Sequence, residues 1–397
     1  MTPVNRAAAP PARSAFPLLV ICCAVSFACY FGSYLRIPVL PLYAASLGAS
    51  TVQVGMINAC FLLMAGLLSI PLGILSDRLG RRSLIVAGLA VLACSSFLLW
   101  FSTSPWQMMG IYLLFGVGLA AFAPTMMSYV ADITPATHLG RAYGWYTMAI
   151  YGGMTLGPAA GGFLGHLLGL RSVFLVSGGA ITLMVAVVIV SLPPSAPREA
   201  PGPERPDFAL LARELAGCRS YVASLVATLG SCYGFGVFVT FFPLLARSRG
   251  VEAGGTGLVF AAQALANALS RLPFGYISDR TGRRSRLVVL GLTVFGAALA
   301  GLAFCRTAGG FMLAAAVLGL GMGVAYTAIG ALITESVPVR LRGLAMGGYN
   351  TSIYIGMMAS SALMGALIKG VGFTGGFLVT AGITLAVTGG FHLMSER

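Results

Sequence analysis

The chain has 397 residues, of which 58% are hydrophobic and only 9% are charged, and its formal net charge is +14. An ordinary soluble domain carries roughly 25% charged residues, so this composition excludes a large water-soluble enzyme and indicates a protein whose main solvent is lipid. The positive charge does not indicate nucleic-acid binding, because the basic residues form short clusters between long apolar runs.

Twelve apolar runs along the chain are long enough to cross a bilayer, since a spanning helix needs roughly 20 apolar residues. The first run resembles a signal peptide, but similar runs follow throughout, so we interpret it as the first span. The predicted spans cover about residues 16–42, 52–75, 84–102, 107–130, 142–164, 171–192, 220–245, 256–276, 287–305, 310–333, 343–367 and 372–394. The sequence therefore predicts an all-α integral membrane protein with 12 transmembrane helices.

The arginines predict the orientation of these helices in the membrane. If both termini are cytoplasmic, most arginines between the spans lie on the cytoplasmic side, as the positive-inside rule requires. An even number of spans places both termini on the same side. We therefore expect a multi-pass protein of the bacterial cytoplasmic (inner) membrane, with both termini in the cytoplasm.

A proline-rich segment at mid-chain divides the spans into two similar halves. The segment GILSDRLGRR at residues 73–82 recurs as GYISDRTGRR at residues 275–284. Such a repeat indicates a duplication, and parallel six-helix repeats place a substrate site between them near the bilayer midplane. We predict an N-terminal six-helix bundle (1–192), a Pro-rich cytoplasmic linker (193–219) and a C-terminal six-helix bundle (220–397). The Pro-rich residues 193–206 of the linker are expected to be semi-extended.

The repeated segment resembles the motif G-x-L-x-D-R-x-G-R-R of the major facilitator superfamily. The resemblance covers the chain apart from the N-terminal dozen residues and the linker, and two copies at the expected positions make it specific. It implies the major facilitator fold, in which two pseudo-symmetric six-helix bundles alternate access to a central site. It also implies a role for Asp77 and Asp279 in cytoplasmic charge networks.

Acidic and basic side chains gather at the predicted cytoplasmic ends of the spans, where carboxylates and guanidinium groups can pair. We predict that these pairs hold the two halves together on the cytoplasmic side and release when the halves part. The alternative is that they only fix the topology and anchor helix ends. The residues are Asp77, Arg78, Arg81, Arg82, Asp132, Arg141, Asp279, Arg280, Arg283, Glu335 and Arg342.

The fifth predicted span carries a pattern that resembles the helix 5 motif of antiporters, notably drug:proton antiporters, and this resemblance implies export. Small residues let helix backbones approach closely and proline bends a helix, so a general packing seam is the alternative. The fourth span departs from that group, because Tyr112 stands where drug antiporters usually carry a proton-relay arginine. The helix 5 pattern consists of Gly144, Gly153, Gly157, Pro158, Gly161 and Gly162.

Two arginines lie within the predicted spans, whereas all ten acids fall at membrane edges or in loops. This distribution argues against a broad pump for cationic drugs. In the eighth span, Gln263, Asn267 and Arg271 form one polar stripe at helical spacing. The pattern around Arg271 resembles helix 8 of oxalate and monocarboxylate transporters, which implies contact with a substrate carboxylate. The alternative is that Arg271 extends to the cytoplasmic interface.

Arg36, late in the first span, is either a second anion contact or an anchor at the outer interface. Other polar and aromatic residues within the spans are candidate substrate contacts, and helix packing is the alternative explanation for each of them. These candidates are Tyr30, Tyr34, Tyr233, Tyr326, Asn350 and Tyr354.

Together these features predict a secondary active transporter that moves a small organic solute, anionic or amphiphilic, by proton-coupled export. Proton-coupled uptake of a carboxylate and multidrug efflux are the alternatives. The sequence has no nucleophile–base pair, metal cluster or cofactor motif typical of an enzyme, so we expect no catalytic residues, metal or cofactor. The eight cysteines include no C-x-x-C pair, and we interpret them as packing residues. We expect the protein to be a monomer.

Overall fold

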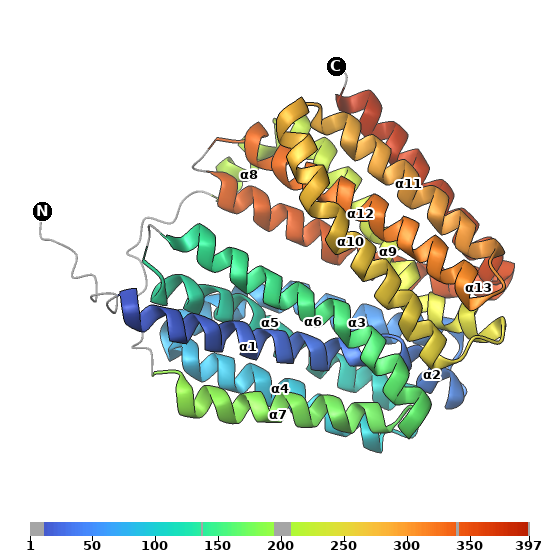
Figure 1. Cartoon of the computed structure of the whole chain (residues 1–397), viewed down its shortest axis with the longest axis horizontal. Coiled ribbons are helices and arrows are strands. Elements are labelled where there is room, and N and C mark those ends of the chain that lie inside the picture. The colour runs from blue at the N-terminus through green and yellow to red at the C-terminus, as the bar shows by residue number, and fades with distance from the viewer. Residues whose placement is uncertain (1–11, 136–137, 194–207, 339–340, 396–397) are drawn as a thin grey trace, which may run out of the picture.

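The computed structural model describes residues 12–135, 138–193, 208–338 and 341–395, and all regular secondary structure in these residues is helical (Figure 1). The predicted all-α fold class is therefore confirmed. In chain order the helices are α1 (Ala12–Leu35), α2 (Val39–Ser46), α3 (Thr51–Leu79), α4 (Arg81–Phe101), α5 (Pro105–Ile133), α6 (Leu139–Leu168), α7 (Ser172–Ser191), α8 (Phe208–Ala216), α9 (Arg219–Ser248), α10 (Ala253–Thr281), α11 (Arg284–Phe304), α12 (Ala308–Ser336) and α13 (Arg342–Ser395).

Figure 1 shows two groups of helices, α1–α7 in blue to green and α9–α13 in yellow to red, which we call the N-terminal and C-terminal bundles. α1 and α2 are consecutive parts of one crossing. Gly372 interrupts α13 with a φ of 74°, a conformation that favours glycine, and so divides it into two crossings. By length and apolar composition alone, nine helical segments of the described residues qualify as membrane spans. α13 is one of these nine segments although it crosses twice. α6 and α10 do not qualify, because their many glycines and polar residues lower their mean hydropathy.

Local sequence explains where several helices begin. α3 starts with a capping box, in which the Ser50 hydroxyl accepts from the Gln53 backbone N–H and the Gln53 side chain accepts from the Ser50 backbone N–H. The side chains of Ser104 and Thr307 likewise accept backbone N–H bonds at the starts of α5 and α12. These caps satisfy donors that a helix start leaves without an internal partner.

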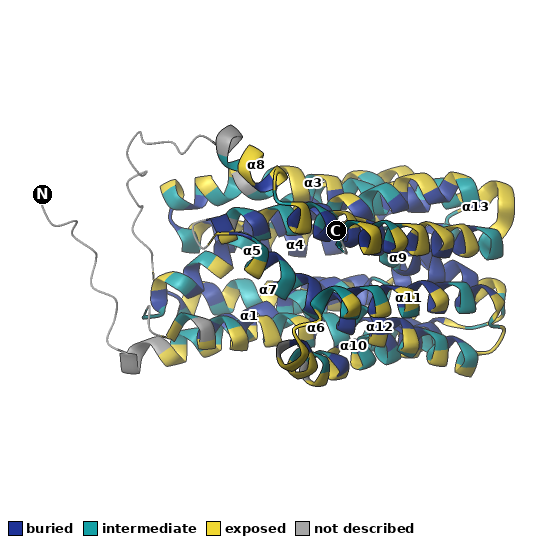
Figure 2. Cartoon of the chain, turned by 90° about the horizontal axis from the view of Figure 1, so that it is seen from above, coloured by how far each residue is buried: buried dark blue, intermediate teal, exposed yellow. Residues whose placement is uncertain are grey.

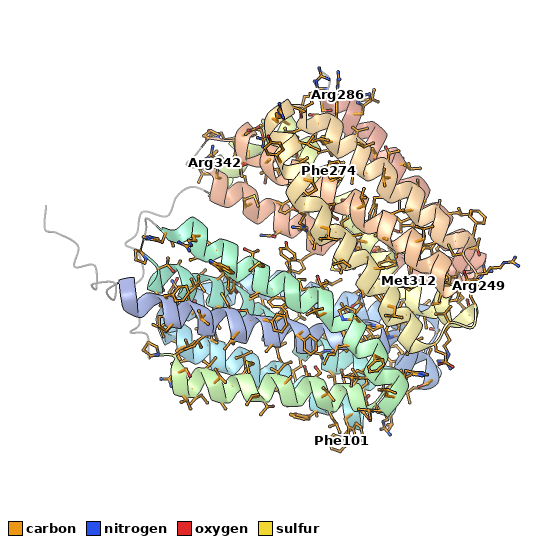
Figure 3. All side chains as sticks on the ribbon, viewed as in Figure 1. Phe101, Arg249, Phe274, Arg286, Met312 and Arg342 are labelled. Atoms are coloured by element: carbon orange, nitrogen blue, oxygen red, sulfur yellow. The ribbon has the colours of Figure 1, made fainter. Side chains whose placement is uncertain are left out.

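The outer surface of both bundles is apolar. Figure 2 shows exposed residues on the outward faces of the helices and buried residues between them. Leu67, Val190 and Leu313 are among many large apolar side chains that are more than half exposed. Figure 3 shows Arg286 and Arg342 at one end of the C-terminal bundle and Arg249 at the other. Charged ends on either side of an apolar surface are typical of a protein that spans a bilayer.

The two bundles approach most closely at one end. We call the end that carries α8 and the start of α1 the proximal end, and the opposite end the distal end. At the distal end the Thr51 hydroxyl of α3 donates to the Gly365 carbonyl of α13 at 2.8 Å. A Cβ placed on Gly162 of α6 would lie 2.5 Å from the Ala253 carbonyl oxygen of α10. Figure 1 shows the two bundles diverging toward the proximal end.

The described part of the linker contains a short helix. Residues 208–216 form α8, whereas the segment predicted to be semi-extended lies, apart from Pro193, in residues 194–207, outside the described part of the structure. Leu211 and Leu215 of α8 pack against the C-terminal bundle, while Arg213 and Glu214 are exposed. This i, i+4 apolar spacing stabilises a short amphipathic helix on the bundle.

Candidate substrate site

The first crossing is broken at Arg36, between α1 and α2. Pro38 lacks a backbone N–H and restricts the residue before it, and residues 36–38 form turns between the two helices. The Arg36 carbonyl oxygen accepts from the backbone N–H groups of Val39 and Leu40, at 3.1 and 2.7 Å. Non-helical backbone inside a membrane span is tolerated where it is buried in protein or lines a cavity, and transporters use such breaks as binding sites.

The Arg36 side chain is 1% exposed, which does not fit an anchor at the membrane interface. Its Nε donates to the Ser33 carbonyl oxygen at 3.2 Å, and its Cζ lies 3.9 Å from the ring centroid of Phe115. Nη1 and Nη2 have no hydrogen-bond partner among the described residues. Because a buried charge normally requires paired and hydrogen-bonded neighbours, these two donors suit a ligand anion.

Arg36 lines a cavity of about 90 Å³ that residues of both bundles enclose. This volume holds several water molecules but is smaller than the pockets of about 300–1,000 Å³ that bind drug-sized molecules. The polar side chains of its wall are Ser33, Tyr34, Arg36, Asn58, Tyr112 and Gln263. The cavity therefore combines one guanidinium with several neutral hydrogen-bonding groups.

The polar stripe of α10 is divided between this cavity and the approach to it. Gln263 lines the cavity, and its Nε2 contacts the Met322 sulfur at 3.6 Å. Arg271 lies eight residues further along, roughly 12 Å toward the proximal end at 1.5 Å per residue. Its Nε donates to Asn267 Oδ1 at 2.9 Å, and its Cζ lies 4.6 Å from the ring centroid of Tyr151 in α6. Arg271 thus contacts the opposite bundle instead of the cavity wall.

Tyrosines connect these two regions. Tyr34 lines the cavity, and its ring centroid lies 6.3 Å from that of Tyr30. Tyr151 of α6 faces Arg271 of α10, and a Cβ placed on Gly66 of α3 would lie 3.8 Å from Tyr354 Cβ of α13. The space between the bundles on the proximal side of Arg36 is therefore bordered by phenol groups from both bundles.

Other candidates from the sequence lie elsewhere. The Tyr326 hydroxyl contacts Cys232 Sγ at 3.1 Å, and both are buried inside the C-terminal bundle, while Tyr233 is half-buried on α9. Asn350 and Tyr354 line a second cavity of about 760 Å³, between α3 on one side and α8, α9 and α13 on the other.

The charged residues at the proximal ends form pairs within each bundle. Arg81 binds Asp77 at 3.1 Å and also contacts Asp132 of α5. In the C-terminal bundle, Arg284 binds Glu335 at 2.7 Å. The charged residues selected from the sequence include Arg283 but not Arg284. The two copies of the motif turn differently, because α4 begins directly after Gly80 whereas α11 begins two residues after Gly282.

The remaining charged candidates have other positions. Arg82 donates to the Ile189 carbonyl oxygen, and Arg342 donates to the Thr334 carbonyl oxygen at 2.9 Å. The side chain of Asp279 lies outside the described part of the structure. Five of the candidate arginines are exposed at the proximal end, namely Arg78, Arg141, Arg280, Arg283 and Arg342.

The helix 5 motif packs α6 against both bundles. A Cβ on Gly153 would lie 2.5 Å from the Phe27 carbonyl oxygen of α1, and one on Gly157 would lie 2.7 Å from Tyr34 Cβ. Gly161 also abuts α1, and Pro158 lines the central cavity. Gly162 abuts Ala253 and Gly257 of α10, whereas Gly144 has open space around it. The motif therefore provides one seam inside the N-terminal bundle and one contact across to the other bundle.

Sequence analysis missed a polar contact that joins the bundles on the distal side of the cavity. Asn58 Nδ2 of α3 donates to Thr240 Oγ1 of α9 at 2.7 Å, and the Thr240 and Ser361 hydroxyls are 3.0 Å apart. Asn58 is a polar residue in an otherwise apolar stretch of α3, which was the available signal. At the distal surface His166 Nδ1 lies 2.9 Å from Glu252 Oε2.

The comparisons agree with this architecture. The chain is 24% identical over 364 residues to an uncharacterized MFS-type transporter, MJ1560, of Methanocaldococcus jannaschii, which covers 91% of this chain and 93% of that protein. It is 27% identical over 285 residues to the multidrug resistance protein MdtG of Proteus mirabilis, covering 68% of this chain and 70% of that one.

Among solved structures, a bacterial homologue of the human lysosomal transporter Spinster, in an inward-facing and unoccupied conformation, superposes with a TM-score of 0.82. It is 16% identical, and the match covers 98% of both chains. The sequence model of the Major Facilitator Superfamily matches residues 22–227 and again 224–394. The chain therefore belongs to the Major Facilitator Superfamily of membrane transporters.

Proposed function

We propose that this protein exports a small organic anion across the bacterial cytoplasmic membrane in exchange for protons, and that Arg36 binds the negative group. The observation that carries the proposal is the buried guanidinium of Arg36, with two nitrogens that have no partner among the described residues, in a cavity walled by both bundles. An ionisable residue inside a membrane protein marks a substrate or ion site by default.

The surroundings of Arg36 support an anion in preference to a cation. A carboxylate can accept two parallel N–H bonds from the planar guanidinium, which adds geometric specificity to the charge attraction. The Phe115 ring lies against the other side of the guanidinium and helps to stabilise it while no anion is bound. Gln263, whose side chain also lines the cavity, has an amide group that can donate a further hydrogen bond.

The proposed cycle starts from the conformation described above, with the proximal end facing the cytoplasm. An anion approaches between the diverging bundles, passes Arg271 and its Tyr151 neighbour, and reaches Arg36. The bundles then close proximally and part distally, which breaks the Thr51–Gly365 hydrogen bond and separates Gly162 from α10. The Arg81 and Arg284 pairs lie within their own bundles here, and we expect contacts across the bundles when the proximal end closes.

Export and proton coupling are proposed on separate grounds. The helix 5 motif resembles that of antiporters, and the similarity to a multidrug resistance protein points the same way. The membrane potential also favours the outward movement of an anion, because one charge moved across 100 mV is worth about 2.3 kcal/mol. Proton-coupled uptake of a carboxylate would use the same site in the opposite direction.

Flux measurements in proteoliposomes test this proposal. A panel of radiolabelled carboxylates is loaded, and efflux is measured after a pH jump and, separately, after a potassium diffusion potential. We expect Arg36→Gln to lower anion flux at least about tenfold, since hydrogen bonds to charged groups are worth about 1.5–3 kcal/mol each. Arg271→Ala should reduce flux less, and Arg306→Gln, an exposed distal arginine, serves as the control. Anion flux by Arg36→Gln equal to that of wild type would overturn the proposal.

Multidrug efflux is the second candidate, favoured by the tyrosines that border the space between the bundles. Aromatic faces suit apolar or cationic drugs. The same proteoliposomes, loaded with a lipophilic cationic dye, distinguish the two functions. Dye efflux that is insensitive to Arg36→Gln, together with no carboxylate flux, would support the drug exporter.

A further inference from the structure

The cavity of about 760 Å³ is a groove beside the central site. Its walls come from α3 in the N-terminal bundle and from α9 and α13 in the C-terminal bundle. Leu62, Leu67, Leu225, Ile355 and Met358 represent its largely apolar lining. This volume falls in the range of small-molecule sites, so the groove is large enough for a substantial apolar group.

Glycines create the space in this groove. A Cβ placed on Gly347 would meet nothing within 4 Å, and one on Gly66 would meet only Tyr354 Cβ, at 3.8 Å. Gly347 and Met358 both line the groove, so it follows α13 for roughly 16 Å at 1.5 Å per residue. Leu63 and Leu67 on its α3 side are 47% and 64% exposed, so the groove is accessible from the apolar outer surface.

The inner end of the groove adjoins the anion site. Phe61 and Met357 line the central cavity, and the next residues, Leu62 and Met358, line the groove. Tyr354 lines the groove and lies three residues, about one helical turn, before Met357, which lines the cavity with Arg36. A chain-like molecule in the groove can therefore extend toward Arg36.

The proximal end of the groove lies at α8. Leu215 and Ala216 of this helix contribute to the wall, while Arg213 and Glu214 are exposed. A short helix with an apolar face packed inward and charges outward is typical of the membrane–water interface. The mouth of the groove is thus placed at the headgroup level of the proximal leaflet.

We propose that the substrate is a single-chain amphiphile with an anionic head, which enters from the proximal leaflet between α3 and α13. Its alkyl chain lies in the groove and its head binds Arg36. This inference rests on the proposed anion site and adds the substrate class and the route by which the substrate arrives. Nη1 and Nη2 of Arg36, which have no hydrogen-bond partner among the described residues, lie in the adjoining cavity, and with the apolar walls of the groove they match the two ends of such a molecule.

Equilibrium binding of straight-chain carboxylates tests the proposal. The protein is held in phosphatidylcholine nanodiscs, and butanoate to dodecanoate compete with radiolabelled octanoate. We expect affinity to rise about fourfold per methylene until the chain fills the groove, as burial of a CH₂ predicts. Gly347→Leu should lower the affinity for dodecanoate relative to butanoate at least about tenfold, by filling the groove where a side chain has room.

Two further variants keep the test decisive. Gly66→Leu fills the same groove from α3, and Gly179→Leu, at an exposed glycine of α7 with open space around it, is the matched control that should keep the chain-length dependence. The groove proposal would be overturned if affinity in wild type did not depend on chain length, or if both groove variants kept the wild-type dependence. The groove would then be occupied by a bilayer lipid. In those cases loss of binding in Arg36→Gln would still support the anion site. Equal carboxylate binding by wild type and Arg36→Gln would overturn both the groove proposal and the anion site.

Discussion

The guanidinium carbon of Arg36 lies 6.0 Å from the ring centroid of Tyr112, so the turn between α1 and α2 supplies the positive charge at a cavity wall to which α5 contributes an aromatic ring. Tyr112 is the residue that stands where drug antiporters, by resemblance, carry an arginine. This chain therefore carries an arginine at the cavity wall, as that pattern does, but at position 36 and not at position 112.

This arrangement predicts that the charge can be moved from one helix to the other. Arg36→Leu should lose anion transport, and Tyr112→Arg added to it should restore transport at least partly, because both positions line the same cavity. Tyr112→Arg alone should be impaired, since two guanidinium groups would then repel each other in a buried site. Anion flux in proteoliposomes measures all three variants. Equal inactivity of the single Arg36→Leu and the double variant would contradict the prediction.

The distal closure depends on the contact between Gly162 and α10. A Cβ at this position would lie 2.5 Å from the Ala253 carbonyl oxygen and 2.6 Å from Gly257 Cα, so Gly162→Leu should force the distal ends apart. Spin labels at Thr103 and Arg306, on a cysteine-free background, report the distance between the bundles at that end. We expect a longer distance in Gly162→Leu and an unchanged one in the control Gly179→Leu. Identical distances in all three proteins would show that this contact does not hold the distal end closed.

The ion pair at the same end should matter much less. The side chains of His166 and Glu252 are 53% and 73% exposed, and exposed pairs contribute about 1 kcal/mol or less. Glu252→Gln should therefore change the ratio of closed to open molecules by less than about fivefold. The same pair of spin labels measures this ratio. A larger change in Glu252→Gln than in Gly162→Leu would show that the ion pair matters more than the Gly162 contact.

The C-terminal charge network makes a prediction about two adjacent arginines. Arg284 binds Glu335 at 2.7 Å, whereas Arg283 is exposed at the start of α11. Arg284→Gln should lower the melting temperature of the purified protein more than Arg283→Gln, although by an amount corresponding to about 1 kcal/mol or less, because Glu335 is 56% exposed. Equal melting temperatures of the two variants would mean that the Arg284 pair does not stabilise the bundle.

Much of the fold followed from composition and pattern, because a bilayer leaves few alternatives to helices for a chain with long apolar runs. The duplicated motif identified the family for the same reason: two copies in matching places are specific. Boundaries and pairings were less accessible. Arg283 and Arg284 are equivalent on sequence grounds, and a small difference in the turn at Gly282 decides which one reaches Glu335.

The candidate site shows the same limit. Arg271 and Arg36 were both visible as arginines within spans, and the polar stripe favoured Arg271. The structure places Arg271 against Tyr151 and buries Arg36 in the central cavity, at the turns between α1 and α2. The Pro38 break was the available signal for a site at Arg36, but burial and the distance to Phe115 depend on how seven helices pack, which one sequence does not specify.

The central claim, that Arg36 binds an anion between the bundles, can be tested without knowing the substrate. Crystals of the protein soaked in iodide would reveal bound anions by anomalous scattering. We predict a peak in the central cavity in contact with Nη1 or Nη2 of Arg36, and its loss in Arg36→Gln. Iodide peaks at surface arginines together with none at Arg36, in crystals of this conformation, would contradict the claim.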